Sequence, residues 1–168
     1  MNPKFEVQMS VKYMYDFMLY HNYSRLSGLF GAFVGAVGLL IGVYNVLNGN
    51  AQESAIGFFV AILFFVITPI SIKNSAKRQI LSTPAFQNSL EYELTEEGVI
   101  VRQGEEEALT KWEEMDKAVN SSRSIILYIT RIRAIILPKE CMGEQYENVV
   151  RMISTHMPPK KVRIRQIH

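Results

Sequence analysis

Cysteine and histidine are scarce in this chain of 168 residues. The single cysteine, Cys141, allows no intrachain disulfide and no cysteine-based zinc site. The three histidines, His21, His156 and His168, are far apart in the sequence. There is no glycine-rich phosphate loop, nucleophile elbow or zinc-binding histidine pair, so we expect no catalytic residue, no metal and no cofactor. A net charge of +2 is too balanced for a dedicated nucleic-acid-binding protein, and we expect no nucleic-acid partner.

Charge is missing altogether from two long apolar stretches. No charged side chain lies between residues 26 and 52, and none lies between residues 54 and 72. Each stretch has about the ~20 residues that a membrane-spanning helix needs. We therefore predict a transmembrane hairpin with spans at 26–47 and 55–72. A buried helix pair in a soluble protein is the alternative, but such helices normally keep a polar stripe. We do not expect a cleaved signal peptide, because the first run is longer than the apolar region of such a peptide, starts only after about twenty-five residues and leads straight into a second run.

Basic residues flank the two runs but are absent from the link between them. They stand before the first run and after the second, at Lys4, Lys12, Arg25, Lys73, Lys77 and Arg78. Cytoplasmic segments of membrane proteins carry an excess of such residues. We therefore expect a multi-pass protein of the cytoplasmic membrane with both termini in the cytoplasm.

Glycines recur along one face of the first run, at Gly28, Gly31, Gly35, Gly38 and Gly42. Steps of three and four residues place them together, and small residues let helix backbones approach closely. The stripe either packs against Gly57 and Ala61 of the second run, or mediates self-association or docking of a protein partner. Neither run has an ionisable group at its centre, which argues against a pump, transporter or channel. Pro69 is expected to bend or end the second helix.

Residues 1–25 are expected to form a strand and an interfacial helix. Phe5, Val7 and Met9 alternate with polar residues, as in a half-buried strand. A strand this short needs a sheet to pair with, and only the C-terminal part of the chain can supply one. A helix over 11–24 follows, rich in aromatic residues of the kind found at membrane interfaces.

Residues 79–168 are predicted to form a small cytoplasmic domain. Period-two patterns and turn residues predict strands at 90–94, 99–102, 108–112, 115–120, 124–130 and 132–137. An amphipathic helix opens at Gly143, with Val149, Val150 and Ile153 on its apolar face. The predicted fold class is therefore an α+β membrane protein, in which a two-helix transmembrane hairpin carries a small antiparallel-sheet domain, pleckstrin-homology-like and closed by a C-terminal helix.

Three segments of this domain, LEYELTEEGVIV, TKWEEMDKAV and IILYITRIRAIILPK, resemble the YcxB-like family of bacterial membrane proteins. The resemblance covers nearly the whole chain and implies an N-terminal strand and helix, two spans and a cytoplasmic pleckstrin-homology-like domain. Its motifs are structural: the Glu97-Gly98 turn, Trp112, and the run 136–139. The family usually has a basic and then an aromatic residue where Glu140 and Cys141 stand here. The resemblance implies no activity for any particular residue.

Charge is unevenly distributed over the C-terminal domain. Residues 91–116 hold ten acidic and two basic residues, whereas residues 117–168 hold ten basic and three acidic ones. Basic residues near a span attract anionic lipids. We expect headgroup contacts at Lys73, Lys77, Arg78, Lys160, Lys161, Arg163 and Arg165. The tail 160–165 has two alternatives to membrane contact: a solvated or strand-forming segment, or a protein-binding one.

The first hypothesis for function is a non-enzymatic integral membrane protein that presents a cytoplasmic interaction domain, as a scaffold, regulator or accessory subunit. Its partners would be membrane lipid and either another protein or a second copy bound through the glycine face. The second hypothesis is a module that senses anionic lipid or the state of the membrane. The third is an enzyme at the membrane face, which would need a cluster of titratable groups in a pocket.

Overall fold

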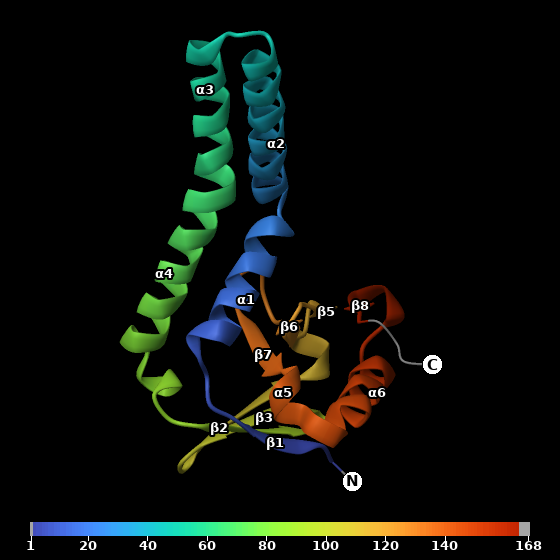
Figure 1. Ribbon diagram of the computed structural model, residues 1–168. Helices are drawn as coiled ribbons and strands as arrows, with labels where there is room; N and C mark the ends of the chain where they lie inside the picture. Colours follow the sequence, from blue (N-terminus) through green and yellow to red (C-terminus); the bar gives the residue numbers. More distant parts are fainter. Residues whose placement is uncertain (1, 165–168) are drawn as a thin grey trace. The chain divides into compact units, whose positions relative to one another are not determined.

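The two ends of the chain fold together and the middle forms a separate unit. The computed structural model describes residues 2–164, which have an α+β architecture (Figure 1). Unit 1 contains the chain up to Phe17 and again from Gln79 onward, and unit 2 is Met18–Arg78. The N-terminal arm is therefore part of the same unit as the C-terminal segment, as its strand pattern predicted.

Sheet A of unit 1 has four antiparallel strands in the order β1-β2-β3-β4. They are β1 (Lys4–Val7), β2 (Leu90–Leu94), β3 (Gly98–Gln103) and β4 (Glu106–Lys111). The predicted N-terminal strand is confirmed: Phe5 is paired with Tyr92, and their rings stack with centroids 6.0 Å apart. Phe5, Val7 and Met9 are all buried, which is the apolar face that the alternating pattern indicated.

Sheet B has the order β7-β6-β5-β8. Its strands are β5 (Lys117–Asn120), β6 (Ser124–Tyr128), β7 (Ala134–Pro138) and β8 (Val162–Arg163). Every residue of β6 is buried, so this strand lies in the core of unit 1. The short strand β8 runs parallel to β5, so part of the basic tail is strand-forming.

Helix α6 (Tyr146–His156) follows β7 in the sequence and buries the predicted apolar face of Val149, Val150 and Ile153. It is not the last element as predicted, because strand β8 of sheet B comes after it. A further helical turn, α5 (Lys139–Met142), was not predicted from the sequence. Single 3-10 turns connect other elements: η2 (Pro84–Phe86), η3 (Trp112–Glu114), η4 (Gly143–Gln145) and η5 (Pro159–Lys161). The turn η3 begins at Trp112, which the sequence placed at the end of a strand; β4 ends one residue earlier, at Lys111.

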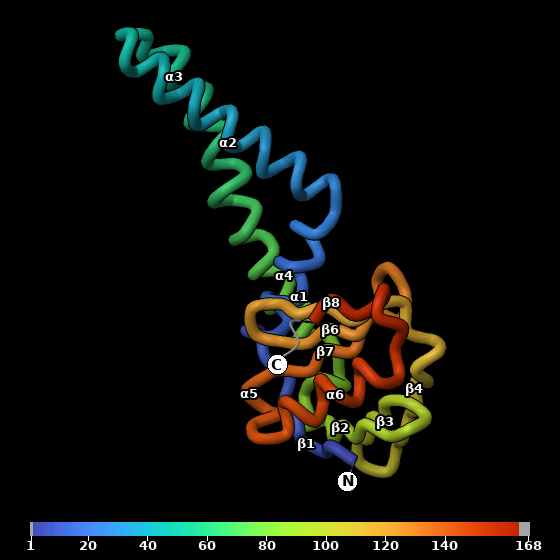
Figure 2. The backbone as a smooth tube through the Cα atoms, turned by 90° about the vertical axis from the view of Figure 1, so that its right-hand side faces the viewer, coloured from blue at the N-terminus to red at the C-terminus, as the bar shows by residue number. Residues whose placement is uncertain are grey.

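The N-terminal helix α1 (Val11–Tyr23) begins in unit 1 and leads into unit 2. Unit 2 is a helical hairpin in which α2 (Leu26–Leu47) packs along α3 (Ala51–Ile62), side by side in both views (Figures 1 and 2). The connection turns at Gly49, whose φ of +77° suits glycine. Leu26–Leu47 and the continuous helical stretch Ala51–Ser82 are both long and apolar enough to cross a membrane.

The second apolar helix does not end at Pro69, contrary to one of the two outcomes expected from the sequence. A π-helical turn, η1 (Leu63–Ile67), precedes the proline, and α4 (Thr68–Ser82) continues well beyond residue 72. Proline lacks a backbone donor and its ring crowds the carbonyl one turn earlier, and a π-turn is a known way to absorb that misfit. The Leu63 carbonyl accepts both the Thr68 backbone N–H and, at 2.9 Å, the Thr68 hydroxyl, so Thr68 ties the end of the π-turn to its start.

Candidate functional site

Four of the five predicted packing glycines, Gly31, Gly35, Gly38 and Gly42, are buried on α2. They face the second helix of the hairpin. A Cβ atom added to Gly38 would lie 3.0 Å from the Gly57 carbonyl oxygen, and one added to Gly42 would meet the Phe58 ring at 3.1 Å. Gly57 and Ala61 of α3 are buried as well. Within the chain, the glycine face is therefore occupied by α3 and η1.

Gly28, the fifth glycine, has a different neighbour. A Cβ atom there would lie 2.0 Å from the Asn22 carbonyl oxygen, which belongs to the end of α1. At the junction between α1 and α2, the backbone of Asn22 therefore lies against Gly28. Only glycine fits at this position, because any side chain would overlap the Asn22 carbonyl.

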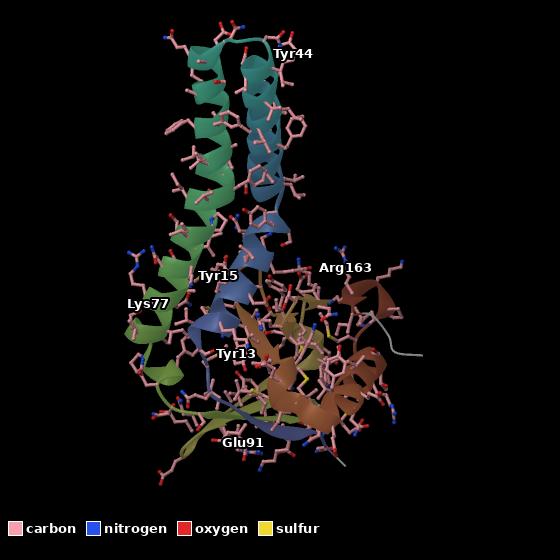
Figure 3. All side chains as sticks on the ribbon, in the orientation of Figure 1. Tyr13, Tyr15, Tyr44, Lys77, Glu91 and Arg163 are labelled. Atoms are coloured by element: carbon pink, nitrogen blue, oxygen red, sulfur yellow. The ribbon has the colours of Figure 1, made fainter. Side chains whose placement is uncertain are left out.

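The predicted headgroup-contacting residues fall into two groups in the structure. Lys73, Lys77 and Arg78 are exposed on α4 of unit 2, where Figure 3 labels Lys77. The second group comes from η5 and β8 of unit 1: Lys160 and Arg163 are exposed, and Lys161 is half-buried and donates to the Met115 carbonyl at 3.0 Å. Arg165 lies outside the described residues.

A buried polar cluster, which we call the α1 clamp, joins α1 to the turn between β5 and β6. Its members are Asp16, Ser121 and Lys139. The Asp16 side chain is buried, and its carboxylate accepts hydrogen bonds from the Ser121 hydroxyl at 2.5 Å and from the Arg123 backbone N–H at 3.1 Å. From the other side, the Lys139 ammonium donates to the Ser121 carbonyl at 2.7 Å. Lys139 closes the run 136–139 that was singled out in the sequence, and its role here is to hold this turn.

A second set of contacts lies next to the clamp, at Glu140. Its carboxylate accepts hydrogen bonds from the Lys12 ammonium at 2.6 Å and the Tyr13 hydroxyl at 3.0 Å. Both hydrogen bonds lower the pKa of Glu140 below its usual value, and the bond from Lys12 has the larger effect. Burial, together with the hydrogen bond to Glu140, raises the pKa of Tyr13 to about 12. Burial also raises the pKa of the Cys141 thiol, so this thiol is a poor nucleophile at neutral pH.

Ionisable groups of the clamp act on one another as well. Burial lowers the pKa of Lys139, and the nearby Asp16 carboxylate opposes that shift. Asp16, Lys12 and Tyr13 tie the N-terminal arm to the C-terminal segment by direct hydrogen bonds to Ser121, Arg123 and Glu140. Sequence reasoning missed the cluster because Asp16 and Ser121 are 105 positions apart and neither belongs to a motif.

The outer face of sheet A carries a charge network around Arg102. Its guanidinium forms ion pairs with Glu93 at 2.6 Å, Glu107 at 2.5 Å and Glu91 at 3.3 Å. Lys4 of β1 lies 2.9 Å from Glu91, which is labelled in Figure 3, and its hydrogen bond lowers the pKa of Glu91. Water and salt screen exposed pairs of this kind, so the network favours strand alignment more than it adds stability.

A cleft of about 410 Å³ opens at the C-terminal end of α6. The His156 imidazole stacks on the buried Trp112 indole at 5.4 Å, and its Nε2 lies 2.8 Å from the Glu96 carboxylate. The other ring nitrogen, Nδ1, lies 2.9 Å from the Met152 carbonyl. The cleft is lined by Glu96, Glu97, Lys111, Trp112, Glu113 and His156. Within residues 2–164 there is no group of three or more histidine, cysteine or acidic side chains arranged to hold a metal ion.

The stability of unit 1 is expected to fall as the pH rises through the pKa of His156. Both ring nitrogens face acceptors, so the imidazolium satisfies two hydrogen bonds; the Met152 carbonyl and then Glu96 raise the pKa of His156 above its ordinary value of 6.5. A pKa that is higher in the folded state adds stability that is complete below 6.5 and is lost above the folded-state pKa.

The measurement is the urea midpoint of the full-length protein in detergent between pH 5.5 and 8.5. The emission of Trp112, the one tryptophan in the chain, reports the unfolding of unit 1. His156→Gln removes the titrating group, so the difference between the wild-type and variant midpoints isolates its contribution. A difference that stays constant across this pH range would contradict the prediction.

Residues 94–153 match the family model described as YcxB-like protein. No curated protein and no solved structure matches the chain. The matched segment begins at the last residue of β2 and ends within α6. It contains sheet B up to β7, Lys139 of the clamp and the lining of the cleft except His156, but not β1, α1 or the apolar hairpin. Over residues 94–153, the chain is similar to the YcxB-like family, the family that its motifs indicated.

Proposed function

We propose that this protein is an integral protein of the cytoplasmic membrane whose two apolar helices span the bilayer. The observation that carries the proposal is the exposure of large apolar side chains on unit 2. Phe30, Phe33, Leu40 and Phe59 are each more than 60% exposed. Only 22% and 11% of the most apolar windows of the two helices are buried. Core helices of soluble proteins are mostly buried, whereas exposure of this extent suits lipid as the solvent.

Basic residues support a hairpin with both of its ends in the cytoplasm. Lys4, Lys12 and Arg25 precede α2, Lys73 follows the apolar part of the second helix, and the link between α2 and α3 has no lysine or arginine. This bias is the one expected for cytoplasmic flanks. Unit 1, which contains both ends of the chain, then lies in the cytoplasm.

Unit 1 is proposed to act as a non-enzymatic interaction domain of pleckstrin-homology-like architecture. Two four-stranded sheets and the amphipathic helix α6, which lies between β7 and β8 in the sequence, support that comparison. The α1 clamp and the Glu140 contacts support a structural use of its buried ionisable groups, because each of these groups bonds two elements together. The glycine face is already occupied by α3, so we assign a protein partner to the surface of unit 1, as expected for a scaffold, regulator or accessory subunit.

The topology is tested by labelling introduced cysteines in intact cells. In a Cys141→Ser background, Asn50→Cys at the link should react with a membrane-impermeant maleimide without lysis. Lys160→Cys, which replaces an exposed residue of unit 1, should react only after lysis. Reaction of both positions in intact cells, or release of the protein from membranes by alkaline carbonate, would contradict the proposal.

An anionic-lipid-sensing role is the second candidate. It is favoured by the basic residues that sheet B gathers at one end, because strand β8 runs parallel to β5 and brings Lys160 and Lys161 to the end where β5 begins. Cationic clusters next to a span are attracted to the anionic cytoplasmic leaflet.

A further inference from the structure

The turn between β6 and β7 is ordered by its own hydrogen bonds. The Arg133 carbonyl accepts from the backbone N–H groups of Ile129 at 2.9 Å and Thr130 at 3.2 Å. The Thr130 hydroxyl in turn accepts from the N–H groups of Ile132 at 3.3 Å and Arg133 at 3.0 Å. These bonds fold residues 130–133 into a defined tip rather than a loose loop.

This tip presents an isoleucine to solvent between two arginines. Ile132 is 75% exposed, which exceeds the other large exposed apolar side chains in the described part of unit 1, Leu81 at 66% and Leu109 at 40%. Arg131 and Arg133 on either side are exposed as well. The ordered turn holds this apolar side chain in water. Its transfer into an apolar environment would therefore lower the free energy of the system.

Further cations lie at the same end of sheet B. Lys117 starts β5 opposite Tyr128, the last residue of β6, and its ammonium lies 4.8 Å from the centroid of the Tyr128 ring. Lys160 and Lys161 precede β8 at this end. Asp116 is the acidic residue next to Lys117 and is exposed. The end of the sheet is therefore predominantly cationic around one protruding apolar side chain.

If the proposed membrane function holds, the short stretch of chain before α2 limits how far this end of the sheet can lie from a bilayer. The Phe17 ring of α1 lies 6.1 Å from the Tyr128 ring, just before the tip, and Phe17 is nine residues before Leu26, where α2 starts. We propose that residues 130–133 are a lipid-docking tip: Ile132 enters the interface of an anionic leaflet, and Arg131 and Arg133 contact lipid phosphates. Guanidinium groups recognise phosphate through paired N–H donors, and apolar side chains insert at the boundary between headgroups and acyl chains.

The test uses the full-length protein in lipid nanodiscs that contain phosphatidylserine, with a tryptophan placed at the tip by Ile132→Trp. When phosphatidylcholine brominated at its upper acyl carbons replaces the ordinary lipid, the introduced tryptophan should lose about half of its emission, because bromine quenches only on close contact at this depth. The matched control is Leu109→Trp on the acidic strand β4, which should lose none. Buried Trp112 contributes the same background to both variants.

Two control experiments test whether the quenching depends on anionic lipid and on the two arginines. Nanodiscs without phosphatidylserine, or Arg131→Glu with Arg133→Glu, should remove most of the quenching. Equal emission with and without bromine in protein that does enter nanodiscs would overturn the docking tip, and would leave an acidic protein surface as the partner of residues 130–133. Failure of the wild-type chain to enter nanodiscs at all would instead overturn the membrane function on which the tip depends.

Discussion

Replacing Gly57 by alanine is expected to destabilise the packing of α2 against α3 by about 2–3 kcal/mol. A Cβ atom at this position would lie 2.5 Å from the Gly42 nitrogen and 2.6 Å from the Gly38 carbonyl oxygen. Both obstacles are backbone atoms in helices and cannot rotate away, so the two helices would have to separate. In a bilayer, the close approach that small residues permit is the main source of attraction between helices.

The loss is measured by SDS titration of the full-length protein in mixed micelles. Dyes on Leu29→Cys and Ile70→Cys, both more than half exposed in the wild-type protein, report the proximity of the two helices in a Cys141→Ser background. Gly31→Ala is the matched control, because its added methyl group meets only side-chain atoms, those of the Phe64 ring at 3.0 Å, and no backbone atom. The control should cost less than about 1 kcal/mol, helped by the better helix propensity of alanine. Equal losses for both variants would rule out backbone contact as the cause.

Asp16→Ala is expected to cost unit 1 about 2–4 kcal/mol of unfolding free energy. The variant removes the acceptor for the Ser121 hydroxyl and the Arg123 backbone N–H, and it leaves the half-buried Lys139 ammonium without its nearby negative charge. Leaving a buried amide donor without an acceptor lowers the unfolding free energy by more than the intact hydrogen bond contributes to it. The expected result is a large fall in the urea midpoint of the Trp112 transition.

Two companion variants make this measurement specific to the clamp. Asp116→Ala removes an exposed aspartate and should change the unfolding free energy by less than about 0.5 kcal/mol. Ser121→Ala, combined with Asp16→Ala in a double-mutant cycle, should show a coupling of at least about 1 kcal/mol. Additive losses would mean that the two side chains act independently and that the clamp is not a unit.

Local patterns predicted most of the elements of this protein. The alternation at Phe5 and Val7 predicted a strand and the need for a partner sheet, and β1 pairs with β2. The spacing of Val149, Val150 and Ile153 predicted the buried face of α6. These predictions succeeded because the period of apolar residues follows directly from the geometry of a strand or a helix. The family resemblance was confirmed over residues 94–153 on motifs that are themselves structural.

Other features had no local signal. The second apolar helix continues past Pro69 because the π-turn η1 absorbs the proline, which the sequence pattern does not reveal. The turn α5 starts directly after β7 at Lys139, where the strand pattern indicated only an end. The sequence also ranked Lys160 and Lys161 as contact residues, but it did not show that they lie at the same end of sheet B as the exposed Ile132.

The sequence by itself determined that unit 2 would consist of two long apolar helices and that unit 1 would need both ends of the chain. Hydrophobic run length and periodicity depend on neighbouring residues, so they can be read without a structure. Only the tertiary structure decided which polar side chains meet: Asp16 with Ser121, His156 with Trp112, and the cations around the tip 130–133. Such contacts join residues far apart in the chain, and their geometry is set by strand register and helix docking, which no single segment encodes.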